Sequence, residues 1–190
     1  MQMLKDAILK RGKALNQDIL LVDSFLNHQV DVALMKAVGE TFAEHFANQG
    51  ITRVVTIESS GIAPASFTAL ALGLPLVIMK KQTSRILNGD LLQTTVRSFT
   101  KGTEYQLSVK HEFLNADDNI LLIDDFLASG EAAFGVITLA KQVGAKIGGV
   151  GIVIEKAFQS GHKRLEDAGI DVYSLARIAS MSADRIEFAD

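Results

Sequence analysis

Two adjacent carboxylates, Asp124 and Asp125, are the side chains of this sequence that are best arranged for chemistry. They follow the uncharged apolar run 120–123 and precede the small pair Ser129-Gly130. The apolar run predicts a short buried strand, parallel to its neighbours, that ends at the carboxylates. Carboxylate oxygens at that position can hold the hydroxyl groups of a ligand or a hard cation such as Mg²⁺.

The segment after the carboxylates has the pattern of a helix N-terminus that can bind a phosphate. Residues 131–142 predict a helix, whose free backbone N–H groups and partial positive charge attract anions. Ser129 adds a hydroxyl donor, and Gly130 lets the backbone approach a ligand closely. A ligand with a phosphate at one end and vicinal hydroxyls at the other, such as a ribose 5-phosphate, fits this arrangement. The residues alone also allow an ordinary turn in which Ser129 caps the helix.

A second loop of small residues follows another predicted strand. Residues 51–57 are rich in β-formers and predict a central strand. Ser59, Ser60 and Gly61 come next, before a predicted helix. Two hydroxyls and a glycine suit the oxygens of a pyrophosphate, although a tight connection with a capping serine explains the same residues.

Four further side chains are candidates for ligand contacts. Asn27 presents a donor and an acceptor that can read the edge of a base, or it is a turn residue. Lys156 can bond a carbonyl of a ring-shaped ligand while Phe158, two positions on in an extended chain, stacks on the ring. The alternative is a solvated lysine and a core phenylalanine. A lysine pair ending in Lys81, after the predicted strand 76–79, can neutralise phosphates or face water.

Composition limits the class of protein. The chain has 190 residues, of which 48% are hydrophobic, so it predicts one domain with a substantial core. A net charge of −3 argues against a general binder of nucleic acids or membrane surfaces. The N-terminus lacks the apolar core of a signal peptide, and no apolar run reaches the roughly 20 residues of a membrane span. We therefore expect a cytoplasmic protein. It has no cysteine, which excludes disulfides and a thiolate nucleophile.

Hydrophobic periodicity predicts alternating helices and strands. The expected helices are 3–11, 31–48, 64–73, 131–142 and 162–168. The expected strands are 18–22, 51–57, 76–79, 91–99, 104–109, 120–123, 145–154 and 172–175. The pair 91–99 and 104–109 lies in a polar stretch rich in Thr and Ser, and we expect it to form a hairpin.

These motifs resemble those of the type I phosphoribosyltransferases, and among them the xanthine phosphoribosyltransferases of bacterial purine salvage. The stretches that carry the resemblance span nearly the whole chain in one order. They are 21–31 (LVDSFLNHQVD), 54–65 (VVTIESSGIAPA), 121–132 (LLIDDFLASGEA), 149–158 (GVGIVIEKAF) and 174–178 (SLARI).

The resemblance implies an α/β fold with a central, mostly parallel sheet flanked by helices, in one domain over residues 1–190. It implies a small hood, from about residues 1–30 plus the C-terminal segment. It also implies a flexible β-hairpin loop at about 82–115, which closes over the site. A homodimer is expected on the same ground.

The implied reaction transfers the 5-phosphoribosyl group of 5-phosphoribosyl 1-pyrophosphate (PRPP) to N9 of xanthine, with Mg²⁺ accompanying PRPP. Asp124 and Asp125 are then the catalytic pair and, indirectly, the metal-associated residues. The expected xanthine contacts are Leu20, Asn27, Lys156 and Phe158. The expected PRPP loop is Ala128, Ser129, Gly130, Glu131 and Ala132. The expected pyrophosphate contacts are Ser59, Ser60, Gly61 and Lys81.

Ala128 departs from the pattern of relatives that use hypoxanthine and guanine, which carry at this position an Asp that contacts the purine N7. A protein general base is therefore not expected there, and xanthine, being fairly acidic, can react partly as its anion. Two alternatives stay open. The base can be guanine, hypoxanthine or adenine, or the chain can be a non-catalytic regulator that senses PRPP. A DNA-binding regulator needs a basic recognition helix, and the roughly fifty residues before the first predicted core strand contain none.

Overall fold

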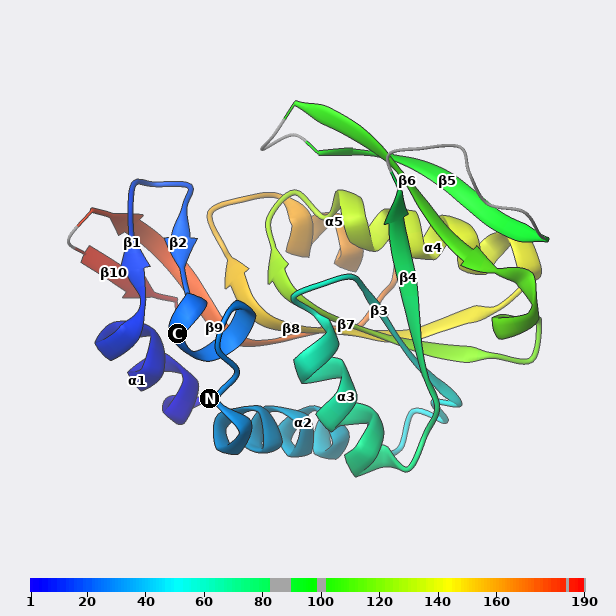
Figure 1. Cartoon of the computed structure of the whole chain (residues 1–190), viewed down its shortest axis with the longest axis horizontal. Coiled ribbons are helices and arrows are strands. Elements are labelled where there is room, and N and C mark those ends of the chain that lie inside the picture. The colour runs from blue at the N-terminus through cyan, green and yellow to red at the C-terminus, as the bar shows by residue number, and fades with distance from the viewer. Residues whose placement is uncertain (83–89, 99–101, 184, 190) are drawn as a thin grey trace.

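The computed structural model describes residues 1–82, 90–98, 102–183 and 185–189. Helices cover both faces of a central sheet (Figure 1). The helices are α1 (Gln2–Arg11), α2 (Val32–Phe46), α3 (Ile62–Leu72), α4 (Glu131–Val143) and α5 (Gly161–Asp167). Two short helical turns are η1 (Asp23–Asn27) and η2 (His111–Phe113). The strands are β1 (Lys13–Ala14), β2 (Leu20–Leu21), β3 (Arg53–Ile57), β4 (Leu76–Gln82), β5 (Leu91–Ser98), β6 (Thr103–Lys110), β7 (Asn119–Leu127), β8 (Lys146–Lys156), β9 (Val172–Ser182) and β10 (Arg185–Phe188).

The central sheet is mostly parallel, which confirms the expected fold class. Within the described residues its eight strands follow the order β10-β9-β8-β7-β3-β4-β6-β5. Strands β9, β8, β7, β3 and β4 are parallel to one another, and β10, β6 and β5 join the two edges in antiparallel pairs. The expected hairpin is confirmed as β5 and β6, whose register runs from Leu91 opposite Lys110 to Ser98 opposite Thr103.

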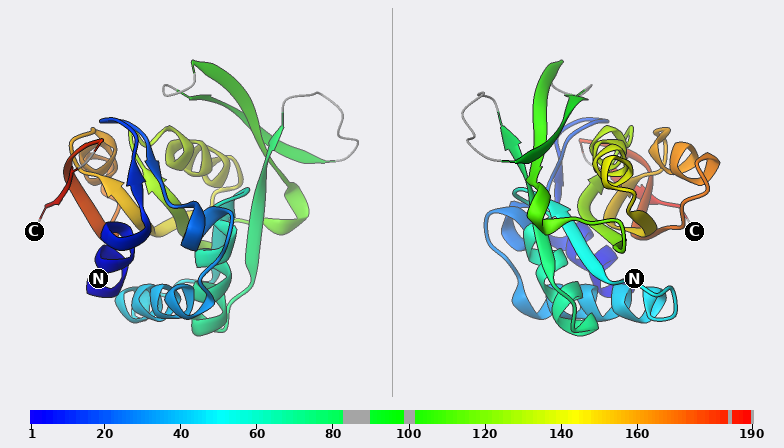
Figure 2. Two further views of the ribbon diagram at one scale, coloured as in Figure 1. Left: turned by 60° about the vertical axis from the view of Figure 1, so that its left-hand side comes forward. Right: turned by 90° about the vertical axis from the view of Figure 1, so that its right-hand side faces the viewer.

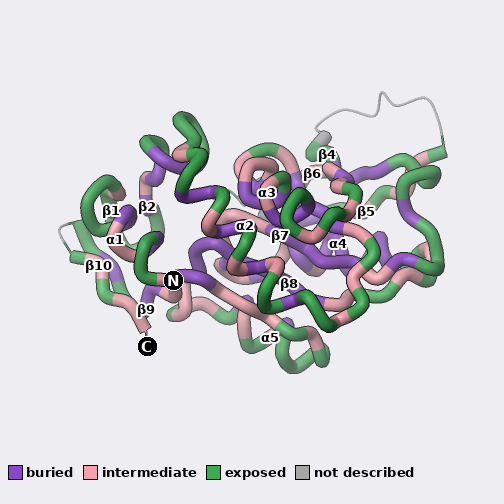
Figure 3. The backbone as a smooth tube through the Cα atoms, turned by 90° about the horizontal axis from the view of Figure 1, so that it is seen from below, coloured by how far each residue is buried: buried purple, intermediate pink, exposed green. Residues whose placement is uncertain are grey.

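The sheet is buried on both faces because β7 sends side chains alternately to two cores. Ile120 and Leu122 pack with α4 and the β5–β6 hairpin, whereas Leu121 and Ile123 pack with α2 and α3. Figure 2 shows α2 and α3 on one side of the sheet and α4 and α5 on the other. Figure 3 shows the buried backbone running along β7 and β8 through the middle of the molecule.

The chain order creates a switch point between β3 and β7. Strand β3 continues through α3 to β4 on one side, and β7 continues through α4 to β8 on the other. The loops after the two strands therefore turn to opposite faces and leave a crevice at the carboxyl ends. Open α/β sheets bind their ligands at such a point.

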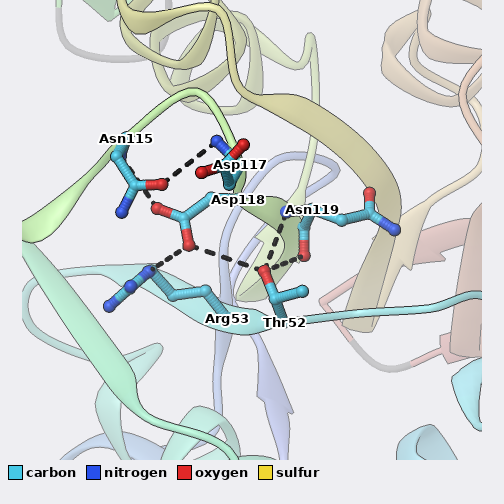
Figure 4. A network of polar contacts seen from close by, with 6 residues as sticks. All are labelled: Thr52, Arg53, Asn115, Asp117, Asp118 and Asn119. Carbon is cyan, nitrogen blue, oxygen red and sulfur yellow. Dashed lines mark hydrogen bonds and ion pairs between the residues drawn. The ribbon is translucent and has the colours of Figure 1, made fainter.

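A polar network fixes the opposite, amino ends of β3 and β7 (Figure 4). The buried Asp118 carboxylate accepts hydrogen bonds from Arg53 Nε at 2.8 Å and from the Asn115 backbone N–H at 2.9 Å. The Asn119 N–H donates to Thr52 Oγ1 at 2.9 Å. These bonds satisfy the buried carboxylate and hold the two strands in register.

Several predicted boundaries are wrong. Strand β7 does not end at the carboxylates but runs on through them to Leu127, because its backbone stays paired with β8 as far as Glu155. Strand β9 runs to Ser182 rather than to residue 175, and β10 was not predicted. The expected flexible loop at 82–115 includes residues 83–89 and 99–101, which lie outside the described part of the chain. Among the described residues, no helix has the length and apolar character needed to cross a membrane.

Candidate active site

A cavity of about 580 Å³ lies at the carboxyl ends of β4, β7 and β8. Its floor is Asp124 and Asp125 together with the segment after β7. The β1–β2 hairpin lines it from one side through residues 18–20, and the β5–β6 hairpin lines it from the other. The pocket lies at the carboxyl ends of the strands, as expected, but its lining comes from β4, β7, β8, the start of α4 and the two hairpins, and includes no residue of β3 or of the loop after it.

The segment 128–130 joins β7 to α4 and has the geometry of an anion-binding loop. Gly130 has a left-handed conformation, with φ of 87°, at the N-cap of α4. A side chain there would be strained, and its Cβ would lie 3.3 Å from the Gly161 Cα. The loop and the first turn of α4 line the cavity. The first N–H groups of a helix have no hydrogen-bond acceptor inside the helix, so those of α4 are available to a ligand. The arrangement can bind a phosphate.

The two carboxylates lie beside this loop in an environment that favours a proton on one of them. The Asp125 backbone N–H donates to Asp124 Oδ1 at 3.0 Å. Burial, and then the negative charge of Asp125, raise the pKa of Asp124 well above its ordinary value, while the charge of Lys81 acts in the opposite direction. A cation or a pair of hydroxyl donors bound here would favour the ionised form.

Lys156 is the last residue of β8 and points into the cavity. Its ammonium group donates to the Asp18 carbonyl in the β1–β2 connection and lies 5.7 Å from the centroid of the Phe126 ring. Burial lowers the pKa of Lys156, and the nearby charges of Asp18 and Asp125 oppose this effect. Leu20 lines the same side of the cavity. The structure thus places Lys156 and Leu20 in the lining of one cavity.

Phe158 and Asn27 are not among the residues that line this cavity. The prediction that Lys156 and Phe158 share one side of an extended segment is wrong. The chain turns after β8, where the Gln159 N–H donates to the Lys156 carbonyl at 2.9 Å, and Phe158 is 43% exposed. Asn27 ends η1 and is also exposed. Their contacts with a base stay predictions.

The predicted pyrophosphate loop lies between β3 and α3, next to the carboxylates. A Cβ on Gly61 would lie 3.1 Å from Asp124 Oδ1 and 2.3 Å from the buried Thr56 Oγ1, so the close approach requires glycine. Glu58 connects this loop to β4, because its carboxylate accepts the Lys81 backbone N–H at 2.7 Å. Lys81 lines the cavity, whereas Ser59, Ser60 and Gly61 are not among its lining residues.

Tyr105, on β6, also lines the cavity, although it is not part of any of the predicted motifs. Burial and the negative charge of Asp124 raise the pKa of Tyr105 to about 12, so its hydroxyl stays a donor at neutral pH. The Lys81 ammonium lies 5.5 Å from the centroid of its ring. No local pattern around Tyr105 indicates this role, because it depends on how the hairpin packs against the sheet.

Comparison with known proteins decides the family. Residues 22–174 match the phosphoribosyl transferase domain family. The chain belongs to this family. Over 188 residues the phosphoribosyltransferase is 58% identical to xanthine phosphoribosyltransferase 1 of Clostridium botulinum, with 99% of each chain covered. It is 50% identical to the xanthine phosphoribosyltransferase of Stutzerimonas stutzeri over 190 residues, which is 100% of each chain. The resemblance inferred from the sequence is thereby confirmed.

Solved structures support the fold of this phosphoribosyltransferase. The adenine phosphoribosyltransferase of Giardia lamblia, complexed with 9-deazaadenine, superposes with a TM-score of 0.78 at 24% identity, over 92% of this chain and 97% of that one. The Rhodothermus marinus enzyme, also an adenine phosphoribosyltransferase, gives 0.75 at 24% identity, over 93% and 97%. At this identity the likeness concerns the fold alone.

Proposed function

We propose that this phosphoribosyltransferase transfers the 5-phosphoribosyl group of PRPP to N9 of xanthine, which gives xanthosine 5'-monophosphate and pyrophosphate in purine salvage. One observation carries the proposal. The carboxylate pair, the loop at the start of α4 and the Lys156 ammonium all line one cavity. The relatives from Clostridium botulinum and Stutzerimonas stutzeri bear the name of this activity.

PRPP would occupy the cavity along the carboxyl ends of the strands. Backbone N–H groups of residues 128–132 bind its 5-phosphate. Asp124 and Asp125 accept from the two ribose hydroxyls. The pyrophosphate extends towards Lys81 and the loop of Ser59, Ser60 and Gly61, which lies beside Asp124.

The purine would lie at the end of β8. Lys156 donates to a xanthine carbonyl in place of its present bond to the Asp18 carbonyl, and Leu20 provides an apolar flank. Asn27 and Phe158 are assigned to this pocket on the resemblance alone. A xanthine anion is favoured beside the Lys156 charge, so the purine can react without a protein base, which Ala128 does not provide.

The reaction requires positioning and charge stabilisation rather than a protein nucleophile. As the bond from C1 to the pyrophosphate loosens, C1 and the ring oxygen gain positive charge. The carboxylates stabilise that charge, and the loop and Lys156 hold the sugar and the base in line. The β5–β6 hairpin, with Tyr105 facing the cavity, limits the access of water.

The side chains fit a magnesium ion that arrives with PRPP. Carboxylate oxygens are the ligands that Mg²⁺ prefers, and Asp124 and Asp125 provide them. In the described part of the chain no group of three or more His, Cys, Asp or Glu residues can hold a metal ion. The ion would therefore be held mainly by the oxygens of PRPP, with Asp124 and Asp125 near it, and would neutralise the leaving pyrophosphate.

The remaining expectations belong to the same proposal. We expect residues 1–30 and the C-terminal segment to form the hood, the hairpin of β5 and β6 to close over the site, and the enzyme to act in the cytoplasm as a homodimer. Light scattering after size exclusion tests the last point. A dimer has twice the 20.5 kDa of the chain, and a monomer at micromolar concentration contradicts it.

A substrate panel tests the function. Initial rates of pyrophosphate release are measured with PRPP, Mg²⁺ and one of four bases: xanthine, guanine, hypoxanthine or adenine. We expect the highest kcat/KM with xanthine. A preference for adenine would contradict the base assignment but not PRPP chemistry. PRPP binding without turnover of any base, together with a PRPP-dependent shift of DNA in a gel, would indicate a regulator.

A further inference from the structure

Glu131 presents an electrostatic difficulty at the phosphate loop. It is the first residue of α4, its side chain is only 24% exposed, and it lines the cavity. A carboxylate at this position favours the helix dipole but repels a phosphate bound at the same N-terminus. The site therefore needs a compensating positive charge close to Glu131.

Arg164 on α5 provides that charge. Its Nη1 lies 2.6 Å from Glu131 Oε1 and also donates to the Ser129 carbonyl. Its guanidinium carbon lies 4.7 Å from the centroid of the Phe134 ring, which fixes the orientation of the planar group on α4. Arg164 is not among the residues that line the cavity. It acts from behind the loop, on the side away from the ligand.

The start of α5 holds a second carbonyl of the same loop. The Gly161 N–H donates to the Ala128 carbonyl at 2.9 Å. A Cβ on Gly161 would lie 2.3 Å from that oxygen and 3.0 Å from the Gly130 nitrogen, so this contact requires glycine. Two successive carbonyls, of Ala128 and Ser129, are thus bonded to α5. Their negative ends are kept from a bound anion, and the N–H groups of the loop stay available to it.

We propose that Arg164 is a positioning residue for the sugar phosphate of PRPP. It neutralises Glu131 and holds the Ser129 carbonyl against α5, which makes the loop complementary to a phosphate. This inference rests on the proposed function, since it takes the 5-phosphate of PRPP as the anion. It goes beyond that function because it assigns a role to α5, which does not touch the ligand.

The test separates the charge of Arg164 from its packing. Arg164→Met, Glu131→Gln, the double variant and Arg164→Lys are compared with Lys163→Met. Lys163 is the neighbouring cation on α5, is 79% exposed and pairs with Asp167, so it controls for the loss of one charge. PRPP affinity is measured by calorimetry without any purine. The KM values for PRPP and xanthine and the melting temperature are measured alongside.

We expect Arg164→Met to weaken PRPP binding by about tenfold or more, the effect of leaving one partner of a hydrogen-bonded charge pair alone. The KM for xanthine should stay within about twofold of wild type. Adding Glu131→Gln should recover part of the PRPP affinity, because the repulsive charge is gone. Arg164→Lys should lose less PRPP affinity than Arg164→Met, and Lys163→Met should bind PRPP as tightly as wild type.

Two results would overturn the role of Arg164. One is PRPP affinity in Arg164→Met equal to that of Lys163→Met. The other is an Arg164→Met variant whose KM values for PRPP and xanthine rise equally and whose melting temperature falls, with no recovery of PRPP affinity in the double variant. That result would mean that Arg164 has a structural role only. Either result leaves the proposed function intact. A wild-type protein that binds PRPP but does not turn over xanthine would contradict the proposed function, while the calorimetric comparison would still decide the role of Arg164.

Discussion

Asp124 lies against Asp125 at the carboxyl end of a buried strand, and its environment favours the protonated form while no ligand is bound. Its pKa is raised by burial and by the neighbouring charge. Such a carboxylate lowers the stability of the free protein at neutral pH. The same property makes it responsive to PRPP and Mg²⁺, because their hydroxyl donors and positive charge favour the ionised form.

Asp124→Asn is expected to stabilise the protein without ligand while it weakens catalysis. The folded wild type retains its proton to a higher pH than the unfolded chain, whose Asp titrates near about 3.9. Wild-type stability therefore falls as the pH rises through the raised pKa of Asp124. At pH 7 we expect Tm to rise by about 2–4 °C in Asp124→Asn, the shift produced by roughly 1 kcal/mol in a domain of this size. The difference in Tm between Asp124→Asn and wild type should vanish towards pH 4. Thermal scans of both proteins between pH 4 and pH 7 measure this difference. A lower Tm for Asp124→Asn than for wild type at pH 7 would contradict the prediction.

Lys156→Met is expected to affect the base and not the sugar phosphate. Lys156 lines the cavity at the end of β8, and loss of a hydrogen bond to a charged group corresponds to roughly 10-fold or more in affinity. The KM for xanthine should rise by at least that factor, and the KM for PRPP should stay within about twofold. Lys36→Met, on the exposed face of α2, is the control. Unchanged kinetics with xanthine in Lys156→Met would show that the base binds elsewhere.

Helix α4 begins and ends with a left-handed glycine, and only the first of them touches the site. Gly130 has φ of 87° and Gly144 has φ of 78°. Replacing either by alanine costs about 1–2 kcal/mol of stability, because L side chains disfavour this conformation. The pair therefore allows a comparison in which the backbone cost is matched and the location differs.

Gly130→Ala is expected to weaken PRPP binding by about tenfold or more. Gly144→Ala is expected to lower Tm about as much as Gly130→Ala does, but to leave PRPP affinity within about twofold of wild type. The added Cβ at 130 would lie 3.3 Å from Gly161 Cα and displace the loop, whereas at 144 it would meet the Ala116 Cβ at an ordinary 3.6 Å. Calorimetry with PRPP and thermal scans measure both effects. Equal PRPP affinity in the two variants would refute the loop assignment.

The elements that could be predicted from the sequence are those with a local signal. Helix α2 has its capping Asp31, which accepts from the Leu34 N–H at 3.1 Å, and a four-residue apolar repeat. The two strands of the β5–β6 hairpin alternate apolar and polar residues in the sequence. The full length of β7 could not be predicted, since two carboxylates interrupt its apolar run and only pairing with β8 keeps them in the strand.

The residues of the candidate site also divide into those with a local sequence signal and those without one. The carboxylates and the loop that follows them could be predicted because they are contiguous in sequence. Tyr105 and Arg164 could not, because each comes from an element that packs against the site only in three dimensions. Arg164 is 33 residues from the Glu131 it neutralises. No periodicity or spacing around either residue indicates the contact.

The molecule as a whole encloses its cavity between two hairpins from different parts of the chain. The β1–β2 hairpin is held over one side by the bond from Lys156 to Asp18, and the β5–β6 hairpin extends the sheet over the other. The N-terminal segment is in turn fixed to the sheet, since the Met1 amino group donates to the Leu175 carbonyl at 2.6 Å. Both ends of the chain lie on the side of the molecule that carries α1 and β9 (Figure 1).

PRPP with Mg²⁺ is expected to slow amide exchange in the β5–β6 hairpin. Val96, Arg97, Thr103 and Tyr105 line the cavity, and a bound ligand would give these strands contacts that the free protein lacks. Strand β10, on the other edge of the same sheet, serves as the internal control and should not change. Exchange followed by mass spectrometry measures both. Equal changes at the two edges would indicate general stabilisation instead of closure over the ligand.

The most direct test of the account is a crystal structure with xanthosine 5'-monophosphate, because this one ligand spans both halves of the proposed site. The account predicts the phosphate on the backbone N–H groups of residues 128–132, the ribose hydroxyls on Asp124 and Asp125, and the base carbonyl on Lys156. A nucleotide bound outside this cavity, or inside it with its phosphate on Lys156 and its base on the loop, would contradict the account.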